Sequence, residues 1–97
     1  MGEFRVAVTD SAKKDLKKLS PKLRKKLLQS LKILEISPFA TIKPIKKIKA
    51  SRKIALYRFR FGEYRVIYHI RGNKVYILAV IHQRDFEKEL RSTLKLG

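Results

Sequence analysis

Residues 56–68 read LYRFRFGEYRVIY and alternate as the two strands of a β-hairpin do. Successive side chains of a strand point to opposite faces of its sheet. One face of the first strand therefore carries three aromatic rings, those of Tyr57, Phe59 and Phe61. The other face carries Arg58 and Arg60, about 7 Å apart. Arg65 comes just after the Gly62-Glu63 turn and can join them. We expect the aromatic rings to pack in the core and across strands, which leaves an outer face rich in arginine.

The pattern continues on the C-terminal side of this hairpin. Strands are predicted over 54–61, 64–70 and 74–81. Gly62-Glu63 and Gly72-Asn73 are turns too short for anything but antiparallel neighbours, so the three strands form a meander. The strongly basic segment 39–53, interrupted by Pro44, predicts a loop or a partly formed edge strand.

The N-terminal half predicts one strand and two helices. Residues 3–8 alternate weakly and indicate the strand. Thr9 or Asp10 can cap the first helix, whose apolar residues follow at helical spacing: Ala12, Leu16 and Leu19. Ser20-Pro21 ends that helix and starts a second. The apolar stripe of the second helix is Leu23, Leu27, Leu31 and Leu34, and Ser37-Pro38 ends it. Such a short break predicts an antiparallel helical hairpin.

A short C-terminal helix is expected over 85–94. The sequence therefore predicts one domain, residues 1–97, of the α+β class, with the order β-α-α-β-β-β-(α). The expected architecture is a small, mainly antiparallel sheet with the helical hairpin packed on one face.

Charge is the dominant feature of the composition. Twenty-five Lys and Arg against eight Asp and Glu give a net charge of +17 at pH 7. Such self-repulsion is relieved by a polyanion. Heat adaptation adds Lys and Glu together, whereas Glu is scarce here. We therefore expect nucleic acid or an acidic protein as partner. No cysteine, targeting segment or membrane-spanning run is visible, and we expect a soluble, cytoplasmic protein without a metal or cofactor.

The arginine face suggests a specific chemistry. RNA is cleaved by its own 2′-hydroxyl when a base takes the hydroxyl proton, cations stabilise the pentacoordinate phosphate and an acid protonates the leaving oxygen. Arginine suits the middle task. The strand end can place an imidazole and one more cation near the same sheet. The candidate catalytic residues are Arg58, Arg60, Arg65, His82 and Arg84, and the candidate RNA-binding residues are Lys46, Lys47, Lys49, Arg52 and Lys53.

Each of these residues also has a purely structural interpretation. Arginines on a solvated sheet face are ordinary, and His82 can simply cap the end of its strand. We assign no role to His69.

The hairpin, the 4–19 segment, the Ser37-Pro38 break and the closing HQRD at 82–85 together resemble RelE-type toxins of the RelE/ParE superfamily. The resemblance covers nearly the whole chain. It implies the toxin of a type II toxin–antitoxin pair, with an acidic antitoxin as partner. RelE-type members cut mRNA, usually in the ribosomal A site, without metal.

The late motif departs from the family pattern. That pattern often reads His-Arg-Arg-Asp-x-Tyr, whereas Gln83 and Glu87 stand here at the first arginine and at the tyrosine. The departure leaves His82 as the proton-transfer group that the resemblance implies. Two alternatives stay open: a ParE-like inhibitor of DNA gyrase and a non-catalytic RNA-binding module of the same fold.

Overall fold

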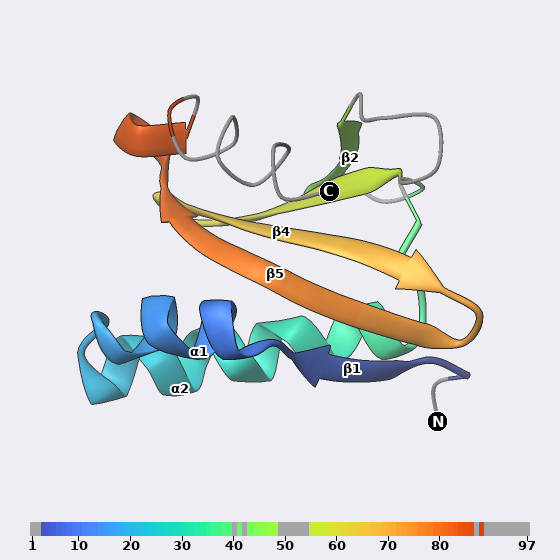
Figure 1. Cartoon of the computed structure of the whole chain (residues 1–97), viewed down its shortest axis with the longest axis horizontal. Helices are drawn as coiled ribbons and strands as arrows, with labels where there is room; N and C mark the ends of the chain where they lie inside the picture. The colour runs from blue at the N-terminus through green and yellow to red at the C-terminus, as the bar shows by residue number, and fades with distance from the viewer. Residues whose placement is uncertain (1–2, 40, 42, 49–54, 87, 89–97) are drawn as a thin grey trace.

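The computed structural model describes residues 3–39, 41, 43–48, 55–86 and 88. Figure 1 shows a sheet with both α-helices on one of its faces. The elements are β1 (Arg5–Val8), α1 (Asp10–Lys17), α2 (Pro21–Ser30), η1 (Leu31–Glu35), β2 (Ile45–Ile48), β3 (Leu56–Phe61), β4 (Tyr64–Arg71), β5 (Lys74–His82) and η2 (Gln83–Asp85). The α+β class and the helical hairpin on one face are as predicted.

The sheet has five strands in the order β1-β5-β4-β3-β2. Strands β3, β4 and β5 form the predicted antiparallel meander. β1 pairs in parallel with β5, with Val6 opposite Val75. β2 pairs antiparallel with β3, so the partly formed edge strand expected within 39–53 is present at Ile45–Ile48.

Side-chain oxygens cap both α-helices at their N-termini. Thr9, and not Asp10, caps α1: its Oγ1 accepts the N–H of Ala12 at 3.3 Å and donates to the carbonyl of Ile77 in β5 at 2.7 Å. Ser20 caps α2, and Pro21 takes the first helical position. The second helix is α-helical only to Ser30, because the chain then tightens into the 3₁₀ turn η1.

The main core lies between the helices and the sheet. Its buried residues are Ala12, Leu16, Leu19, Leu27, Leu31, Leu34, Ile45, Phe59, Val66, Tyr68, Val75, Ile77 and Val80. Tyr68 is fully buried, stacks on Tyr57 at 5.6 Å and donates its hydroxyl to the carbonyl of Pro38 at 2.7 Å. Burial, and then the neighbouring Tyr57, raise the pKa of the Tyr68 hydroxyl. The aromatic face of the hairpin is therefore core, as predicted.

The opposite face of the sheet is not wholly polar. A second apolar cluster lies there and contains Leu56, Ile67, Ala79 and Ile81, with Ile48, Leu78 and Phe86 packed against it. This cluster was not among the features expected from the sequence. It shares its face with the arginines, because Leu56 and Arg58 are two residues apart in β3.

Asp15 joins the helical layer to the sheet. β1 ends at Val8, opposite Ile77, and among the described residues no strand pairs with β5 on that side beyond this point. There the Oδ2 of Asp15 accepts the backbone N–H of Val80 at 2.9 Å. A side chain of α1 thus replaces a strand as the hydrogen-bond partner of β5.

Most of the C-terminal helix predicted over 85–94 lies outside the described residues. In the described part, η2 follows β5, and Phe86 and Lys88 are helical. No helix in the described ranges is long and apolar enough to cross a membrane.

Candidate nucleic-acid interface

Three arginines share the sheet face that the helices leave open. Arg60 lies directly opposite Arg65, and Arg58 lies opposite Ile67 of the second apolar cluster. Directly opposed residues of antiparallel strands share a face, with Cβ atoms about 5 Å apart. Like charges in this arrangement destabilise a sheet. An anion bound between the two guanidinium groups would remove that cost.

The electrostatics of Arg65 reflect this crowding. Its pKa is lowered by partial burial and by the positive charges of Arg58 and Arg60. The described part of the chain has two ion pairs, His82 with Glu63 and Arg84 with Asp85, and neither includes the three arginines of this face. Within the described residues the three cations therefore have no carboxylate to balance them.

Hydrogen bonds hold the Arg65 side chain at the end of the sheet. Its Nη1 donates to the carbonyls of Gly62 and Tyr64, each at 3.0 Å, and its Nη2 donates to Oε1 of Gln83 at 3.2 Å. Gly62 has φ +56°, which favours glycine and lets the turn present its carbonyl to the guanidinium. The Gln83 departure from the family motif thus places an uncharged acceptor beside Arg65.

Arg58 and Arg60 are held differently. The guanidinium carbon of Arg58 lies 5.5 Å from the ring centroid of Phe86, within cation–π range. The Nε of Arg58 is buried without a hydrogen-bond partner in the described structure. Arg60 is exposed. Arg58 therefore packs against an aromatic ring, while Arg60 is open to solvent and accessible to a ligand.

His82 lies at the same end of the sheet but on the other face. Because Arg65 is opposite Ile81, the next residue of β5 must point the other way, and His82 pairs with Tyr64. The two rings meet edge to face at 5.2 Å. The expected single cluster of arginines and imidazole is therefore split across the edge of the sheet, with Arg60 and Arg65 on one side and His82 on the other.

The hydrogen bonds of His82 fix its tautomer. Nδ1 accepts the backbone N–H of Arg84 at 3.2 Å and so caps η2. Nε2 lies 3.3 Å from Oε2 of Glu63. In the neutral ring an accepting Nδ1 requires the proton on Nε2, which then donates to the carboxylate. The capping role that the sequence allowed for His82 is present in the structure.

Glu63 was not among the sequence candidates, although it lies inside the hairpin motif. Its carbonyl accepts the N–H of Gln83 at 2.7 Å, and its carboxylate contacts His82. Arg65, Gln83, Glu63 and His82 therefore form one hydrogen-bonded network around the end of the sheet. The position of Glu63 next to the basic strand was the one hint of a role that the sequence offered. Its partners His82 and Gln83 are about twenty residues away along the chain, so no local pattern reveals these contacts.

The remaining candidates are distributed around this site. Arg84 is exposed and lies 3.8 Å from Asp85, Nε to Oδ2. Lys46 of β2 is opposite Arg58 and shares its face, whereas Lys47 is opposite Tyr57 and points to the helical side. Lys49, Arg52 and Lys53 lie outside the described residues.

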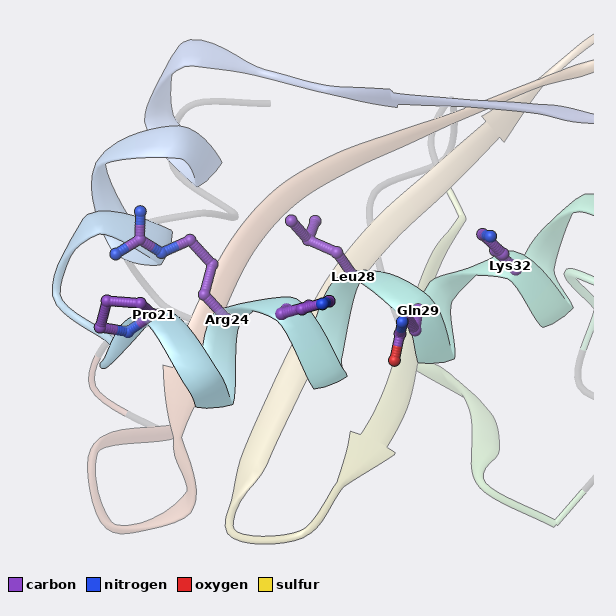
Figure 2. Close-up of a pocket in the computed structure, with 6 residues that line it drawn as sticks. Pro21, Arg24, Leu28, Gln29 and Lys32 are labelled. Atoms are coloured by element: carbon purple, nitrogen blue, oxygen red, sulfur yellow. The ribbon is translucent and has the colours of Figure 1, made fainter.

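Two of the hollows in the described structure are lined by none of the three arginines. One, of about 270 Å³, is next to His82 and is lined by Asp15, Lys18, Leu19, Tyr64, Val80, Ile81, His82, Arg84 and Asp85. The other, of about 430 Å³, is an open depression along α2 lined by Pro21, Arg24, Lys25, Leu28, Gln29 and Lys32. Figure 2 shows Arg24 and Leu28 projecting from the same side of that helix. No three His, Asp or Glu side chains among the described residues gather as a metal site.

The comparisons with known proteins identify the family. The family model described as "ParE toxin of type II toxin-antitoxin system, parDE" matches residues 6–86. The chain belongs to this family. It is a type II toxin–antitoxin toxin of the RelE/ParE superfamily, as the hairpin motif indicated. None of the curated proteins matches the sequence.

Solved toxins share the fold. The archaeal RelE–RelB complex from Pyrococcus horikoshii matches with 28% identity and a TM-score of 0.70, over 84% of this toxin and 96% of that chain. The toxin–antitoxin complex RelBE2 from Mycobacterium tuberculosis matches with 26% identity and a TM-score of 0.69, over 82% and 98%. A mutant of the E. coli toxin RelE in the free state is 20% identical, with a TM-score of 0.62 over 97% and 95%, and is similar in fold.

Proposed function

We propose that this toxin inhibits translation by cutting mRNA without a metal ion, with the ribosome holding the substrate. The observation that carries this proposal is the directly opposed pair Arg60 and Arg65, which lies on the open face without a carboxylate among the described residues. A phosphate that gains charge in the transition state is the ligand that this pair fits best.

The proposed chemistry is attack by the 2′-hydroxyl on the adjacent phosphorus. Arg60 and Arg65 hold the non-bridging oxygens, and Arg58, fixed on Phe86, holds a neighbouring phosphate. Proton transfer takes place at the end of the sheet that carries His82 and Arg84. The RNA strand follows Lys46 of β2, which shares the face of Arg58, and Lys49, Arg52 and Lys53 stay candidates for the path beyond it. Lys47 points to the helical side, so it can contact the strand only at the edge of the sheet.

An acidic antitoxin is the proposed protein partner. Two solved relatives of at least 26% identity are toxin–antitoxin complexes, and a net charge of +17 favours an acidic segment. Such a segment would neutralise the arginine face. A cytoplasmic location follows from the ribosome as target.

Inhibition of DNA gyrase is the second candidate. Two observations favour it: the matching family model is that of ParE toxins, and His82 lies on the opposite face from the arginines. A gyrase inhibitor needs a binding surface and no proton-transfer groups.

Single-turnover cleavage of mRNA on programmed ribosomes separates the two. We expect products that end in a 2′,3′-cyclic phosphate or a 3′-phosphate, at the same rate with and without EDTA. Intact mRNA together with inhibited supercoiling by purified gyrase would replace the first proposal with the second. Loss of cleavage in EDTA, restored by a divalent ion, would contradict the metal-free mechanism.

A further inference from the structure

The network at the end of the sheet contains one carboxylate that contacts the imidazole. Glu63 lies in the β3–β4 turn and its side chain is 72% exposed, so solvent and substrate can reach it. The residue before it is Gly62, whose carbonyl accepts a hydrogen bond from the Arg65 guanidinium. Glu63 thus directly follows Gly62, the residue that holds Arg65, and Arg65 is one of the two arginines proposed to hold the phosphate.

His82 is poorly placed to take the proton itself. Its Nδ1 lone pair is occupied by the N–H of Arg84, and its Nε2 carries a proton in that tautomer. To act as a base or as an imidazolium acid, the ring would have to give up its cap on η2. The imidazole is instead arranged as a donor to Glu63.

We infer that Glu63 is the general base of the proposed RNA cleavage and that His82 is its positioning residue. The inference rests on the proposed function and assigns to it a residue that was not among the sequence candidates. An ionised carboxylate held at one oxygen by an N–H donor keeps its other oxygen free for the 2′-hydroxyl, which suits a base acting near neutral pH.

The step balances without a metal or a redox partner. The 2′-hydroxyl proton passes to Glu63 while its oxygen forms a bond to phosphorus, and the bond from phosphorus to the 5′-oxygen breaks. The leaving 5′-oxygen takes a proton from water. The products are a 2′,3′-cyclic phosphate and a 5′-hydroxyl, and Glu63 returns its proton to solvent.

Several titratable or charged groups lie at the same end of the sheet as Glu63. They are Arg60 of β3, Tyr64 and Arg65 of β4 and His82 of β5, together with Arg84, Asp85, Asp15 and Lys18, which line the adjoining hollow. A general base must be deprotonated before it can accept the 2′-hydroxyl proton, so the cleavage rate should fall on the acid side of neutrality.

The test is the single-turnover cleavage rate on programmed ribosomes, measured from about pH 5 to pH 8.5. Glu63→Gln should lower the rate by about 10²- to 10⁴-fold without weakening mRNA binding. It should also remove the acid-side fall in rate, which a merely structural residue would not do. Glu63→Asp should recover part of the rate. Glu3→Gln, which removes an exposed carboxylate at the opposite end of the sheet, is the matched control and should behave as wild type.

A double-mutant cycle tests the pairing. His82→Ala should lower the cleavage rate. Adding it to Glu63→Gln should lower the rate no further, because both changes disable the same group, the Glu63 carboxylate. Wild-type rates in Glu63→Gln would overturn the assignment and leave the proposed function standing. Fully additive losses would overturn the positioning role of His82. A wild-type toxin that cuts no mRNA would overturn both the inference and the proposed function.

Discussion

At the scale of the residue, the opposed arginines carry the proposed chemistry. Arg60→Ala or Arg65→Ala should slow single-turnover cleavage by about 10²- to 10³-fold, because each removes charge that stabilises the transition state. The Kd for ribosome-bound mRNA should change much less than the rate. If the Kd for mRNA rose by the same factor as the rate fell, the arginines would only bind mRNA and would not stabilise the transition state. Lys25→Ala, on the outer side of α2, is a matched control for loss of one positive charge.

A second residue-scale prediction concerns pH and stability. The pKa of His69 is lowered by partial burial and then by the charge of Arg71, and the ring stacks on Tyr76 at 5.1 Å. The unfolded chain therefore takes up a proton at higher pH than the folded chain does. This contribution to stability is present above the unfolded pKa of about 6.5 and is lost as pH falls through the folded value. In urea unfolding, His69→Gln should lose less stability than wild type between about pH 7.5 and pH 5.

The positions of the site residues could be predicted from the sequence only in part. The sharing of a face by Arg58, Arg60 and Arg65 followed from strand alternation and is confirmed by the register. The side on which His82 lies depends on which residue of β5 is opposite Arg65, and a one-residue difference reverses it. Neither that register nor the contact of Glu63 with His82 is visible in a local pattern, because both join residues distant in sequence.

At the scale of the element, Asp15 replaces the strand that β5 lacks beyond β1. Asp15→Ala would leave the N–H of Val80 without its acceptor, which costs about 1–3 kcal/mol of unfolding free energy. Asp15→Asn keeps an oxygen acceptor and should lose less. Urea unfolding with an unchanged m-value measures the difference. Equal stability of wild type and Asp15→Ala would show that water satisfies this N–H.

The elements themselves and the meander of β3, β4 and β5 were largely predictable, and the pairing of β1 was not. The caps at Thr9 and Ser20 and the apolar spacing define both helices from local sequence. The 3₁₀ turn η1 interrupts the second helix where Leu31 and Leu34, three residues apart, are both buried. The parallel pairing of β1 with β5 depends on how the helical hairpin returns the chain to the sheet, which no local pattern encodes.

At the scale of the whole molecule, a net charge of +17 predicts binding that weakens steeply with salt. The cations lie on both the helical layer and the sheet, but a short RNA can cover only one of these two layers. We expect an uncleavable RNA of about six nucleotides to bind the sheet face, with a salt slope of about 0.7 per phosphate contact. Arg60→Ala should reduce the slope by about 0.7, and Lys25→Ala on the helical layer should leave it unchanged. Fluorescence anisotropy between about 50 and 200 mM salt measures both slopes. Equal reductions in the two variants would place the RNA on the whole basic surface and remove the special role of the arginine face.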